Sequence, residues 1–333
     1  MPIQRGWRFI ALCLFCLLSV QPVFAQGVQI EKQRQIVTRL YAELFSAADF
    51  ASADTILAPS YVNHGYGSAD LSRQDFMTWI ESLHAAMPDF KASVEVLMVE
   101  DTWAASRVRF TGTFTNAWTL NNTTYKPNGK PIVWMLNIMH RFENRVIAED
   151  FTAFDYLGLL QQMDASPLPA VISALVQSGE VNPIEMPPAV TTGQEAVHRE
   201  ALTHVINDAL NNGDYTAIDT YMAADYRTYE PFGNFTREQF KGVVKALRTL
   251  IPDLHVDIPA SVAEGDWLAA RLVYTGTFST PLEAGPLVVP ATNKPIRLII
   301  NVFVHFNTDG IGFEDYKEYN RLGWLVQAGV IKG

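Results

Sequence analysis

The chain has 333 residues, of which 48% are apolar and 18% are charged. This composition is typical of a globular protein and excludes a disordered or fibrous chain. The formal net charge of −10 argues against nucleic acid and anionic membrane surfaces as partners. The length allows two domains of ordinary size.

The N-terminal residues have the pattern of a secretory signal. Arg5 and Arg8 form a basic end, residues 9–20 form an apolar run, and residues 23–25 form a cleavage site that ends in a small residue. Residues 1–25 are therefore predicted to be a signal peptide, and the mature protein to be periplasmic or secreted. The apolar run is short for a membrane span, although an uncleaved anchor is the alternative. No second run of membrane length follows, so we expect no membrane contact after cleavage.

Both cysteines, Cys13 and Cys16, lie in this predicted signal peptide. The mature chain would contain none, although it would be exported to a compartment where disulfides persist. We therefore expect the mature protein to be held together by its apolar core alone.

The mature chain opens with two helical patterns and a short strand. An apolar stripe at helical spacing runs through Ile36, Leu40 and Leu44. A second, shorter helix is predicted to end at Leu57, and a short strand to begin at Tyr61.

The third helix has clear start and stop signals. Ser72 is predicted to be its N-cap, because Asp75 follows three residues later as in a capping box. The helix should end before Pro88, because the residue that precedes a proline disfavours helical backbone angles.

Three or four longer strands, rich in β-branched and aromatic residues, complete this unit. The last two are joined by a tight turn at residues 143–145. In the final strand Glu149, Phe151 and Asp155 share one face, because side chains alternate along a strand. A short apolar helix follows Asp155.

A proline-rich stretch comes next, and residues 166–195 are predicted to be a linker. The unit is then repeated, with identical residues recurring at a constant spacing. A unit of this length is too long for a solenoid repeat, so we predict a tandem duplication with two like domains, at residues 28–165 and 196–333. The matching pairs include Pro88 and Pro252, Trp103 and Trp267, Arg107 and Arg271, and Asn137 and Asn301.

In each unit the helices precede the long strands. This order predicts an α+β fold in which the helices cover one face of a curved antiparallel sheet. We expect a pocket between the helices and the sheet of each domain.

Several motifs carry a family resemblance. They are Pro88-Asp89 after a helix, Gly112-Thr113 in a strand, Lys130-Pro131-Ile132, and the ending Glu149-x-Phe151-x3-Asp155-x2-Gly158. Together they resemble the SnoaL-like polyketide cyclase and ester cyclase family of the NTF2-like superfamily. The resemblance implies two tandem NTF2-like cone-shaped domains, each with N-terminal helices packed on a curved antiparallel sheet. Members of this superfamily often dimerise through the sheet face, so we expect an intrachain pseudo-dimer that is monomeric.

Asp155 is the first candidate for a catalytic residue. In SnoaL-like cyclases an aspartate in a similar position, near the end of the last strand, acts as the acid/base. A carboxylate in an apolar pocket has a raised proton affinity and can take a proton from carbon next to a carbonyl without a metal. The alternative is that Asp155 caps the short helix that follows it. The predicted pocket walls are Trp79, Trp134, Met135 and Phe151.

His64 is the second catalytic candidate, and ester cyclases that this chain resembles commonly have a histidine here. It could share a proton with Asp155 or hold a ligand oxygen, although a solvated histidine at a strand end is the alternative. In the second domain Tyr229 takes the place of His64, and Asn320 takes that of Asp155. Both substitutions remove groups that transfer protons near neutral pH.

Asn137 and Asn301 occupy the same place in an otherwise apolar strand. A buried amide needs hydrogen-bond partners, so each either contacts a ligand or is a satisfied structural amide. His84 and His140 are predicted to be isolated histidines that are exposed or half-buried.

These features lead to two hypotheses about function. In the first, domain 1 is a cofactor-free acid/base cyclase or isomerase for a small hydrophobic carbonyl compound, and domain 2 is degenerate. In the second, the protein binds such a ligand without chemistry, and Tyr229, Asn301 and Asn320 contribute contacts. The sequence contains no cluster of residues at metal-ligand spacing and no cofactor-binding motif, so neither a metal nor a cofactor is expected.

Overall fold

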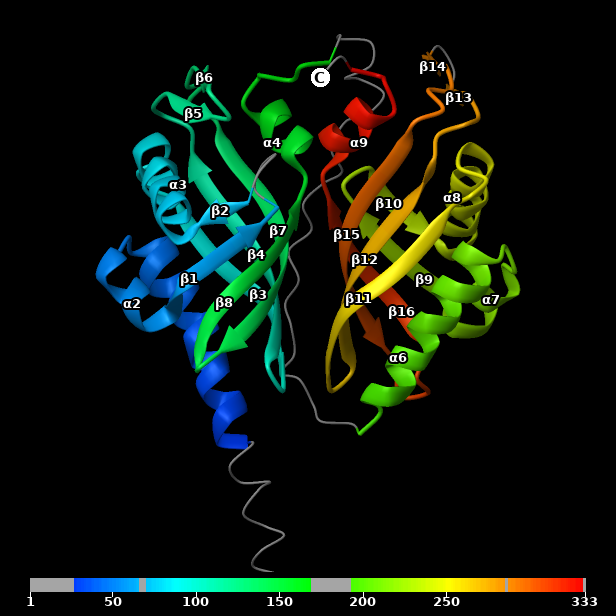
Figure 1. Cartoon of the computed structure of the whole chain (residues 1–333), viewed down its shortest axis with the longest axis horizontal. Helices are drawn as coiled ribbons and strands as arrows, with labels where there is room; N and C mark the ends of the chain where they lie inside the picture. The colour runs from blue at the N-terminus through cyan, green and yellow to red at the C-terminus, as the bar shows by residue number, and fades with distance from the viewer. Residues whose placement is uncertain (1–26, 66–69, 169–192, 285–286, 332–333) are drawn as a thin grey trace, which may run out of the picture.

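The computed structural model describes residues 27–65, 70–168, 193–284 and 287–331. Two halves lie side by side, each with its sheet toward the centre of the molecule and its longer helices on the outside (Figure 1). The predicted signal peptide lies outside the described residues, as do residues 169–192 of the predicted linker. None of the described helices is long and apolar enough to cross a membrane.

The first half contains a six-stranded sheet in the order β2-β1-β8-β7-β4-β3, with β5 and β6 paired separately. β1 and β8 run parallel, and the other neighbours run antiparallel. The helical segments are residues 27–39, η1 (Leu40–Ser46), η2 (Phe50–Ser52), α2 (Ala53–Ile56), α3 (Arg73–Ala86) and α4 (Tyr156–Gln162). The strands are β1 (Leu57–His64), β2 (Leu71–Ser72), β3 (Lys91–Glu100), β4 (Trp103–Thr113), β5 (Trp118–Leu120), β6 (Thr123–Tyr125), β7 (Pro131–Glu143) and β8 (Val146–Phe154).

The second half repeats this order, with the sheet β10-β9-β16-β15-β12-β11 and the separate pair β13 and β14. The α+β fold with tandem halves, predicted from the sequence, is therefore confirmed. The helical segments are α6 (Glu195–His204), η3 (Val205–Asn211), α7 (Thr216–Tyr221), α8 (Arg237–Leu250) and α9 (Arg321–Gln327). The strands are β9 (Met222–Glu230), β10 (Gly233–Thr236), β11 (His255–Glu264), β12 (Trp267–Thr277), β13 (Leu282–Ala284), β14 (Leu287–Val289), β15 (Pro295–Phe306) and β16 (Gly312–Tyr319).

The start and end of α3 follow the predicted signals. The Ser72 side chain accepts a hydrogen bond from the backbone N–H of Asp75, and the Asp75 side chain accepts one from the backbone N–H of Ser72. The helix ends at Ala86, two residues before Pro88. This capping box satisfies donors that a helix N-terminus otherwise leaves unpaired.

The first short strand begins earlier than predicted. β1 starts at Leu57, directly after α2, whereas the sequence pattern placed its start at Tyr61. Leu57 itself already has extended backbone angles, and it pairs with Ile147 of β8. Pairing with a neighbouring strand therefore recruits residues that have no strand signal of their own.

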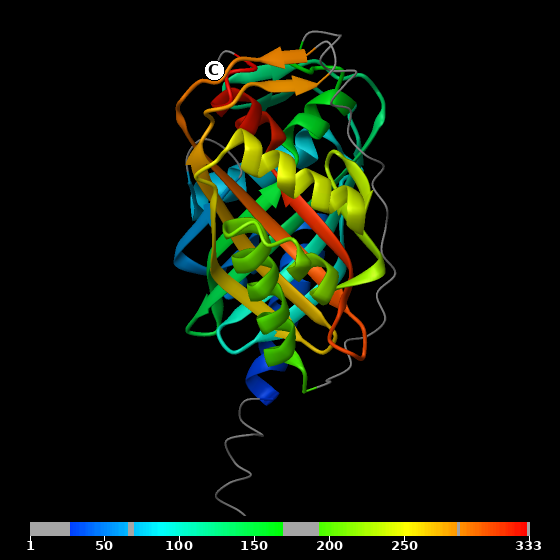
Figure 2. The same ribbon diagram turned by 90° about the vertical axis from the view of Figure 1, so that its right-hand side faces the viewer.

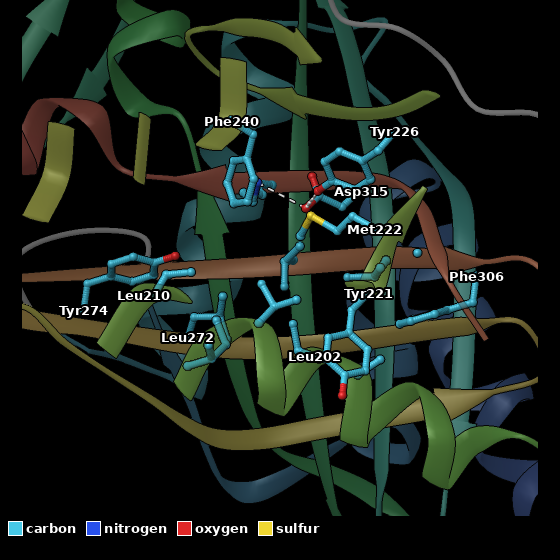
Figure 3. Close-up of a pocket in the computed structure, with 17 residues that line it drawn as sticks. Leu202, Leu210, Tyr221, Met222, Tyr226, Phe240, Leu272, Tyr274, Phe306 and Asp315 are labelled. Carbon is cyan, nitrogen blue, oxygen red and sulfur yellow. Dashed lines mark hydrogen bonds and ion pairs between the residues drawn. The ribbon is translucent and has the colours of Figure 1, made fainter. Parts of the chain in front are cut away.

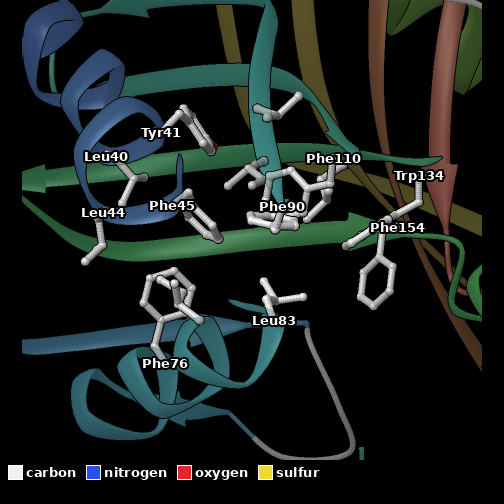
Figure 4. Close-up of a cluster of buried hydrophobic side chains, with 14 of the residues drawn as sticks. Leu40, Tyr41, Leu44, Phe45, Phe76, Leu83, Phe90, Phe110, Trp134 and Phe154 are labelled. Carbon is white, nitrogen blue, oxygen red and sulfur yellow. The ribbon is translucent and has the colours of Figure 1, made fainter. Parts of the chain in front are cut away.

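The helices of the first half pack on the concave face of the sheet and fill the space above it. The buried side chains there are apolar and include many aromatic rings, and they come mainly from η1, α3 and the strands (Figure 4). Phe45, Phe110 and Trp134 are each less than 5% exposed. A filled cone of this kind supplies a large apolar burial, and the residues that the structure describes contain no cysteine.

The other faces of the two sheets pack against each other (Figures 1 and 2). An apolar cluster joins Met98 and Met139 of the first half to Trp267 and Phe303 of the second. Because side chains alternate on a strand, each sheet contributes one face to its own cone and the other to this interface.

Charged side chains close the edges of the interface. Arg34 Nη2 lies 2.5 Å from Glu264 Oε1, and Glu264 Oε2 accepts a hydrogen bond of 2.9 Å from the backbone N–H of Val99. In the reverse sense, Glu100 pairs with Arg199 and accepts a hydrogen bond of 2.9 Å from the backbone N–H of Ala263. These half-buried ion pairs help to fix the relative orientation of the two halves, because the apolar contacts at the centre of the interface are not directional.

Candidate functional site

The four predicted pocket walls do not lie in one pocket. Trp134 lies in the core of the first cone, and Trp79 of α3 packs partly buried against that core. Phe151 belongs to the outer face that meets the second half, and Met135 lies on the face of β7 opposite to Trp134. The expectation of a single pocket was therefore wrong, because it combined residues from both faces of the sheet.

Asp155 is 9% exposed, and it caps helix α4. Its Oδ2 accepts a hydrogen bond of 3.0 Å from the backbone N–H of Gly158, and lies 2.5 Å from Nη2 of Arg321 in the other half. Burial raises the pKa of Asp155, more than the neighbouring Arg321 lowers it. Asn320 caps helix α9 in the same way, through Gly323. Asp155 and Asn320 therefore each cap a helix, which is the alternative that the sequence left open for Asp155.

His64 does not contact Asp155 within the described residues. Its Nδ1 lies 2.9 Å from Asp70 Oδ2, and its ring stacks on Phe151 at 4.7 Å. Its counterpart Tyr229 stacks on Tyr316 in the same manner, at 4.7 Å. Both rings therefore extend the outer faces of their sheets.

Three of the predicted residues do meet in a cleft between the two halves. His64, Phe151 and Asn320 line this cleft, whose volume is about 610 Å³. Arg271 and Arg297 of the second half line it as well, and Asp155 does not.

Asn137 and Asn301 are both fully buried in the interface. The amide of Asn137 donates to the backbone oxygens of Asn301 at 2.8 Å and Tyr316 at 3.0 Å. The amide of Asn301 donates to those of Asn137 and Phe151, both at 2.8 Å. The observed contacts of both amides therefore join the two sheets.

A buried polar network, which the sequence did not predict, lies inside the first cone. His140 is 0% exposed, so the expectation that it is at least half-exposed was wrong. Its Nδ1 lies 2.6 Å from Asp150 Oδ1, and its Nε2 lies 2.8 Å from Ser106 Oγ. Tyr61 donates a hydrogen bond of 2.8 Å to Asp150 Oδ2, and Tyr41 lies 2.8 Å from Ser106 Oγ. Both carboxylate oxygens of Asp150 are therefore occupied.

The second cone keeps the aspartate and the tyrosine of this network, as Asp315 and Tyr226, but loses the other polar groups. His140, Ser106 and Tyr41 correspond to Val304, Ala270 and Ile206. At these three positions the second cone is therefore more apolar than the first.

An apolar cavity of about 30 Å³ lies at this place in the second cone (Figure 3). Its walls come from α6, η3, α7, α8 and the concave face of the sheet. Among the described residues that line it, only Leu202 and Tyr221 are half-buried. The remaining wall residues are buried. Leu202 of α6 and Tyr221 of α7 are therefore the wall residues with the most solvent contact.

Asp315 is the carboxylate that lines this cavity. Its Oδ2 accepts a hydrogen bond from the hydroxyl of Tyr226 and lies 3.1 Å from Lys317 Nζ. Its Oδ1 has no hydrogen-bond partner among the described residues. Burial raises the pKa of Asp315, although Lys317, Thr228 and Tyr226 oppose this shift. A carboxyl group in such surroundings is suited to accept and return a proton.

Lys317 is 5% exposed and is held by several polar groups at the edge of the cavity. Its Nζ donates to Thr228 Oγ1 at 2.7 Å and to Glu230 Oε1 at 3.0 Å. Burial alone would lower the pKa of Lys317, but the carboxylates of Asp315 and Glu230 raise it above its usual value. Lys317 is therefore an ammonium ion that balances the charge of these two acids.

A signal for this site was present in the sequence. Asp150 and Asp315 occupy equivalent positions in both repeats, and they lie on the strand face opposite to Glu149 and Phe151. A charged residue kept on both copies of an apolar strand indicates a buried polar site. Among the described residues, no group of three or more His, Cys, Asp or Glu could hold a metal ion.

The chain is similar to a known family over most of its length. The sequence profile described as SnoaL-like polyketide cyclase matches residues 35–163 and again residues 200–327, which together make up more than half of the chain. No curated protein is significantly similar to it.

Solved structures similar to this chain each match less than half of it. TsrD from Streptomyces laurentii has 23% identity and a TM-score of 0.36, covering 41% of this chain and 97% of its own. IdmH from Streptomyces antibioticus has 22% identity and a TM-score of 0.35, covering 40% and 98%. AclR from Streptomyces galilaeus has 20% identity and a TM-score of 0.37, covering 42% and 85%.

The duplicated match of the profile coincides with the duplicated order of helices and strands. The fold of this family supports a cofactor-free function of the cyclase or isomerase type. The chain belongs to the SnoaL-like polyketide cyclase family, as two tandem copies of its NTF2-like fold.

Proposed function

We propose that this protein is a cofactor-free acid/base catalyst for a small hydrophobic carbonyl compound, and that its site is the cavity of the second cone. The observation that carries this proposal is the state of Asp315. One of its carboxylate oxygens has no described hydrogen-bond partner, and the carboxyl lines an apolar cavity. Its raised pKa brings the proton affinity closer to that needed for a base near neutral pH.

In the proposed reaction, the Asp315 carboxylate takes a proton from the carbon next to the carbonyl. The electron pair of the broken C–H bond moves toward the carbonyl oxygen and forms an enolate. In a conjugated enolate, return of the proton to the far carbon gives isomerisation. Alternatively, the enolate carbon attacks a second carbonyl of the same molecule, and Asp315 returns the proton to the alkoxide that forms, which completes ring closure. Asp315 holds the proton between these steps, so no cofactor is consumed.

The first half offers a weaker case for this chemistry. Asp150 is the counterpart of Asp315, but His140 and Tyr61 occupy its oxygens. Asp155 also has one oxygen without a described hydrogen-bond partner, but its other oxygen caps a helix and pairs with Arg321. The hypothesis of an active domain 1 and a degenerate domain 2 rested on Asp155 and His64, and the geometry instead favours domain 2.

The size of the cavity limits what it can hold without movement. A volume of about 30 Å³ is close to that of one water molecule in the liquid. Uptake of a ring compound therefore requires Leu202 and Tyr221, between α6 and α7, to move apart. Burial of such a ligand would be driven by its apolar surface.

The test of this proposal measures, by NMR, the rate at which the protons next to the carbonyl of cyclohexanone exchange with deuterium in D₂O. The wild-type protein is expected to accelerate this exchange. Asp315→Asn should lower the rate on the order of 100-fold or more, because an amide cannot act as the base. Val304→Leu adds one methylene to the cavity wall and should slow exchange, at a stability cost of about 1–3 kcal/mol at most.

Asp155→Asn is the matched control, because it makes the same change at the other candidate aspartate. It should retain most of the rate, since the amide can still cap α4. Loss of the rate in Asp155→Asn, with Asp315→Asn fully active, would place the chemistry in the first half. Binding of cyclohexanone without any exchange would support the alternative, a non-catalytic binding protein.

The place of action depends on the leader sequence. Residues 1–25 have the pattern of a cleaved signal peptide, so we propose that the protein acts in the periplasm or outside the cell.

A further inference from the structure

The two halves differ sharply in charge at one pair of equivalent positions in their interface. In the first half, Arg107 is 4% exposed and faces two acidic side chains. Its Nη1 lies 3.4 Å from Glu318 Oε1, and its Nε lies 3.7 Å from Glu95 Oε2. The neighbouring Arg109 also approaches Glu95, at 3.3 Å. Two arginines thus share two acids.

The equivalent of Arg107 in the second half is Arg271, and it has lost both acids. Pro259 stands at the position of Glu95, and Ala153 stands at the position of Glu318. Within the described residues Arg271 forms no ion pair. Its side chain donates to Asn301 Oδ1 at 3.3 Å, and its guanidinium lies over the ring of Phe151 at 5.1 Å.

A second arginine increases this local excess of positive charge. Arg297 lines the same cleft as Arg271, and it forms no ion pair with any described residue. Burial and the charge of Arg297 together lower the pKa of Arg271 to about 10. Among the described residues that line the cleft, the one acid is Asp70, and His64 is paired with it.

The cleft itself has room for a ligand. Its volume is about 610 Å³, and it opens where Glu95 and Glu318 are replaced by the smaller Pro259 and Ala153. Its walls include the aromatic rings of Trp103 and Phe151 and the side chain of Ile299. Apolar walls around a buried cation suit a ligand that has both an apolar body and an anionic end.

We propose that this interdomain cleft binds a small organic carboxylate, whose anionic end lies beside Arg271 and Arg297. The carboxylate would occupy the position that corresponds to that of the acidic side chains beside Arg107 in the first half. The apolar body of the ligand would lie against Trp103 and Phe151. An arginine fork matches a carboxylate with two parallel hydrogen bonds, and its strength rises when water is excluded.

This site is separate from the cavity of the second cone. The two share no lining residue, because Arg271 and Val273 point to the interface, whereas Leu272 and Tyr274 line the cavity. Ligand binding in the interdomain cleft therefore does not depend on whether Asp315 is catalytic.

The first experiment measures binding of phenylacetate to the full chain by isothermal titration calorimetry. One phenylacetate per chain is expected, with phenylacetamide at least about tenfold weaker because it lacks the charge. Arg297→Gln should weaken phenylacetate binding by about tenfold. Because Arg297 is exposed, this variant should fold normally. Equal affinity for phenylacetate and phenylacetamide, or no effect of Arg297→Gln, would overturn the proposal.

The second experiment restores the missing acid. Ala153→Glu should place a carboxylate beside Arg271, as Glu318 lies beside Arg107, and should abolish phenylacetate binding. Ala153→Gln is the matched control of equal size and should retain more affinity than Ala153→Glu. Equal loss in both variants would overturn the charge-based argument. Inorganic phosphate binding as tightly as phenylacetate would overturn the choice of an organic ligand.

Discussion

Glu318 shows how the interface places an acid where it does not ionise readily. Burial raises its pKa from the usual 4.5 to about 8, although Arg107 acts in the opposite direction. The charge of nearby Asp155 adds to the rise. Glu318 therefore binds its proton more tightly in the folded protein than in the unfolded chain.

This shift predicts a pH dependence of stability. Because the folded-state pKa is higher, the contribution of Glu318 is complete below about pH 4.5 and is lost as pH rises through about 8. The free energy of unfolding should fall between pH 5 and 8.5, and Glu318→Gln should make this fall shallower. Each unit of pKa shift corresponds to about 1.4 kcal/mol. Urea unfolding at a series of pH values measures the slope.

The exposed Glu81 supplies the control for this measurement, because Glu81→Gln makes the same chemical change away from the interface. Its slope should match that of the wild-type protein. If Glu318→Gln shows the wild-type slope as well, Glu318 does not control this pH dependence. Asp155 and Asp315 also have raised pKa values, so some slope should remain in every variant.

At the scale of single elements, strands β7 and β15 are joined by their central asparagines. Each amide donates to two backbone oxygens of the other half, and each side-chain oxygen accepts from an arginine of its own half. The side-chain nitrogen and oxygen of Asn137 and of Asn301 are thus all hydrogen-bonded within the protein. Such a buried and reciprocal pair fixes the register between the two sheets.

We predict that Asn137→Ala lowers the free energy of unfolding by about 2–4 kcal/mol. The substitution removes three buried hydrogen bonds. It leaves the oxygens of Asn301 and Tyr316 without these donors and removes the Asn137 acceptor of Arg107. Chemical denaturation measures the loss. Asn207→Ala is the control, because Asn207 is exposed on η3, and its effect should stay within about 0.5 kcal/mol. Equal effects of the two substitutions would contradict a structural role for the Asn137 amide.

At the scale of the whole molecule, each half covers the sheet face of the other. The centre of this contact is apolar, with Met98, Met139, Trp267 and Phe303 all fully or nearly fully buried. A sheet face of this kind would drive dimerisation if it were exposed. Because the contact is made within one chain, the apolar face of each sheet is already covered by the other half.

The protein is therefore predicted to be a monomer at micromolar concentration. Static light scattering behind a size-exclusion column should give the mass of one mature chain, independent of concentration. A stable dimer or larger assembly would contradict the prediction. As a reference, either half expressed alone exposes the apolar face and should self-associate.

Much of the fold could be read from local patterns. The capping boxes at Ser72 and Thr236, and the ends of α3 and α8 before Pro88 and Pro252, depend on residues a few positions apart. The repeat predicts two like domains without knowledge of their contacts. Such features are decided by short-range backbone geometry, so the sequence contains them directly.

Which face of each strand points into the cone was decided only by tertiary structure. Alternation shows that Glu149, Phe151 and Asp155 share a face, but a period of two does not tell that face from the one that carries Asp150. The helices cover the face of Asp150 and Asp315, and the second half covers the other. Likewise, the pairs of Asp155 with Arg321 and of Arg107 with Glu318 join residues far apart in the chain. Long-range packing determines what each side chain meets, and no local pattern encodes it.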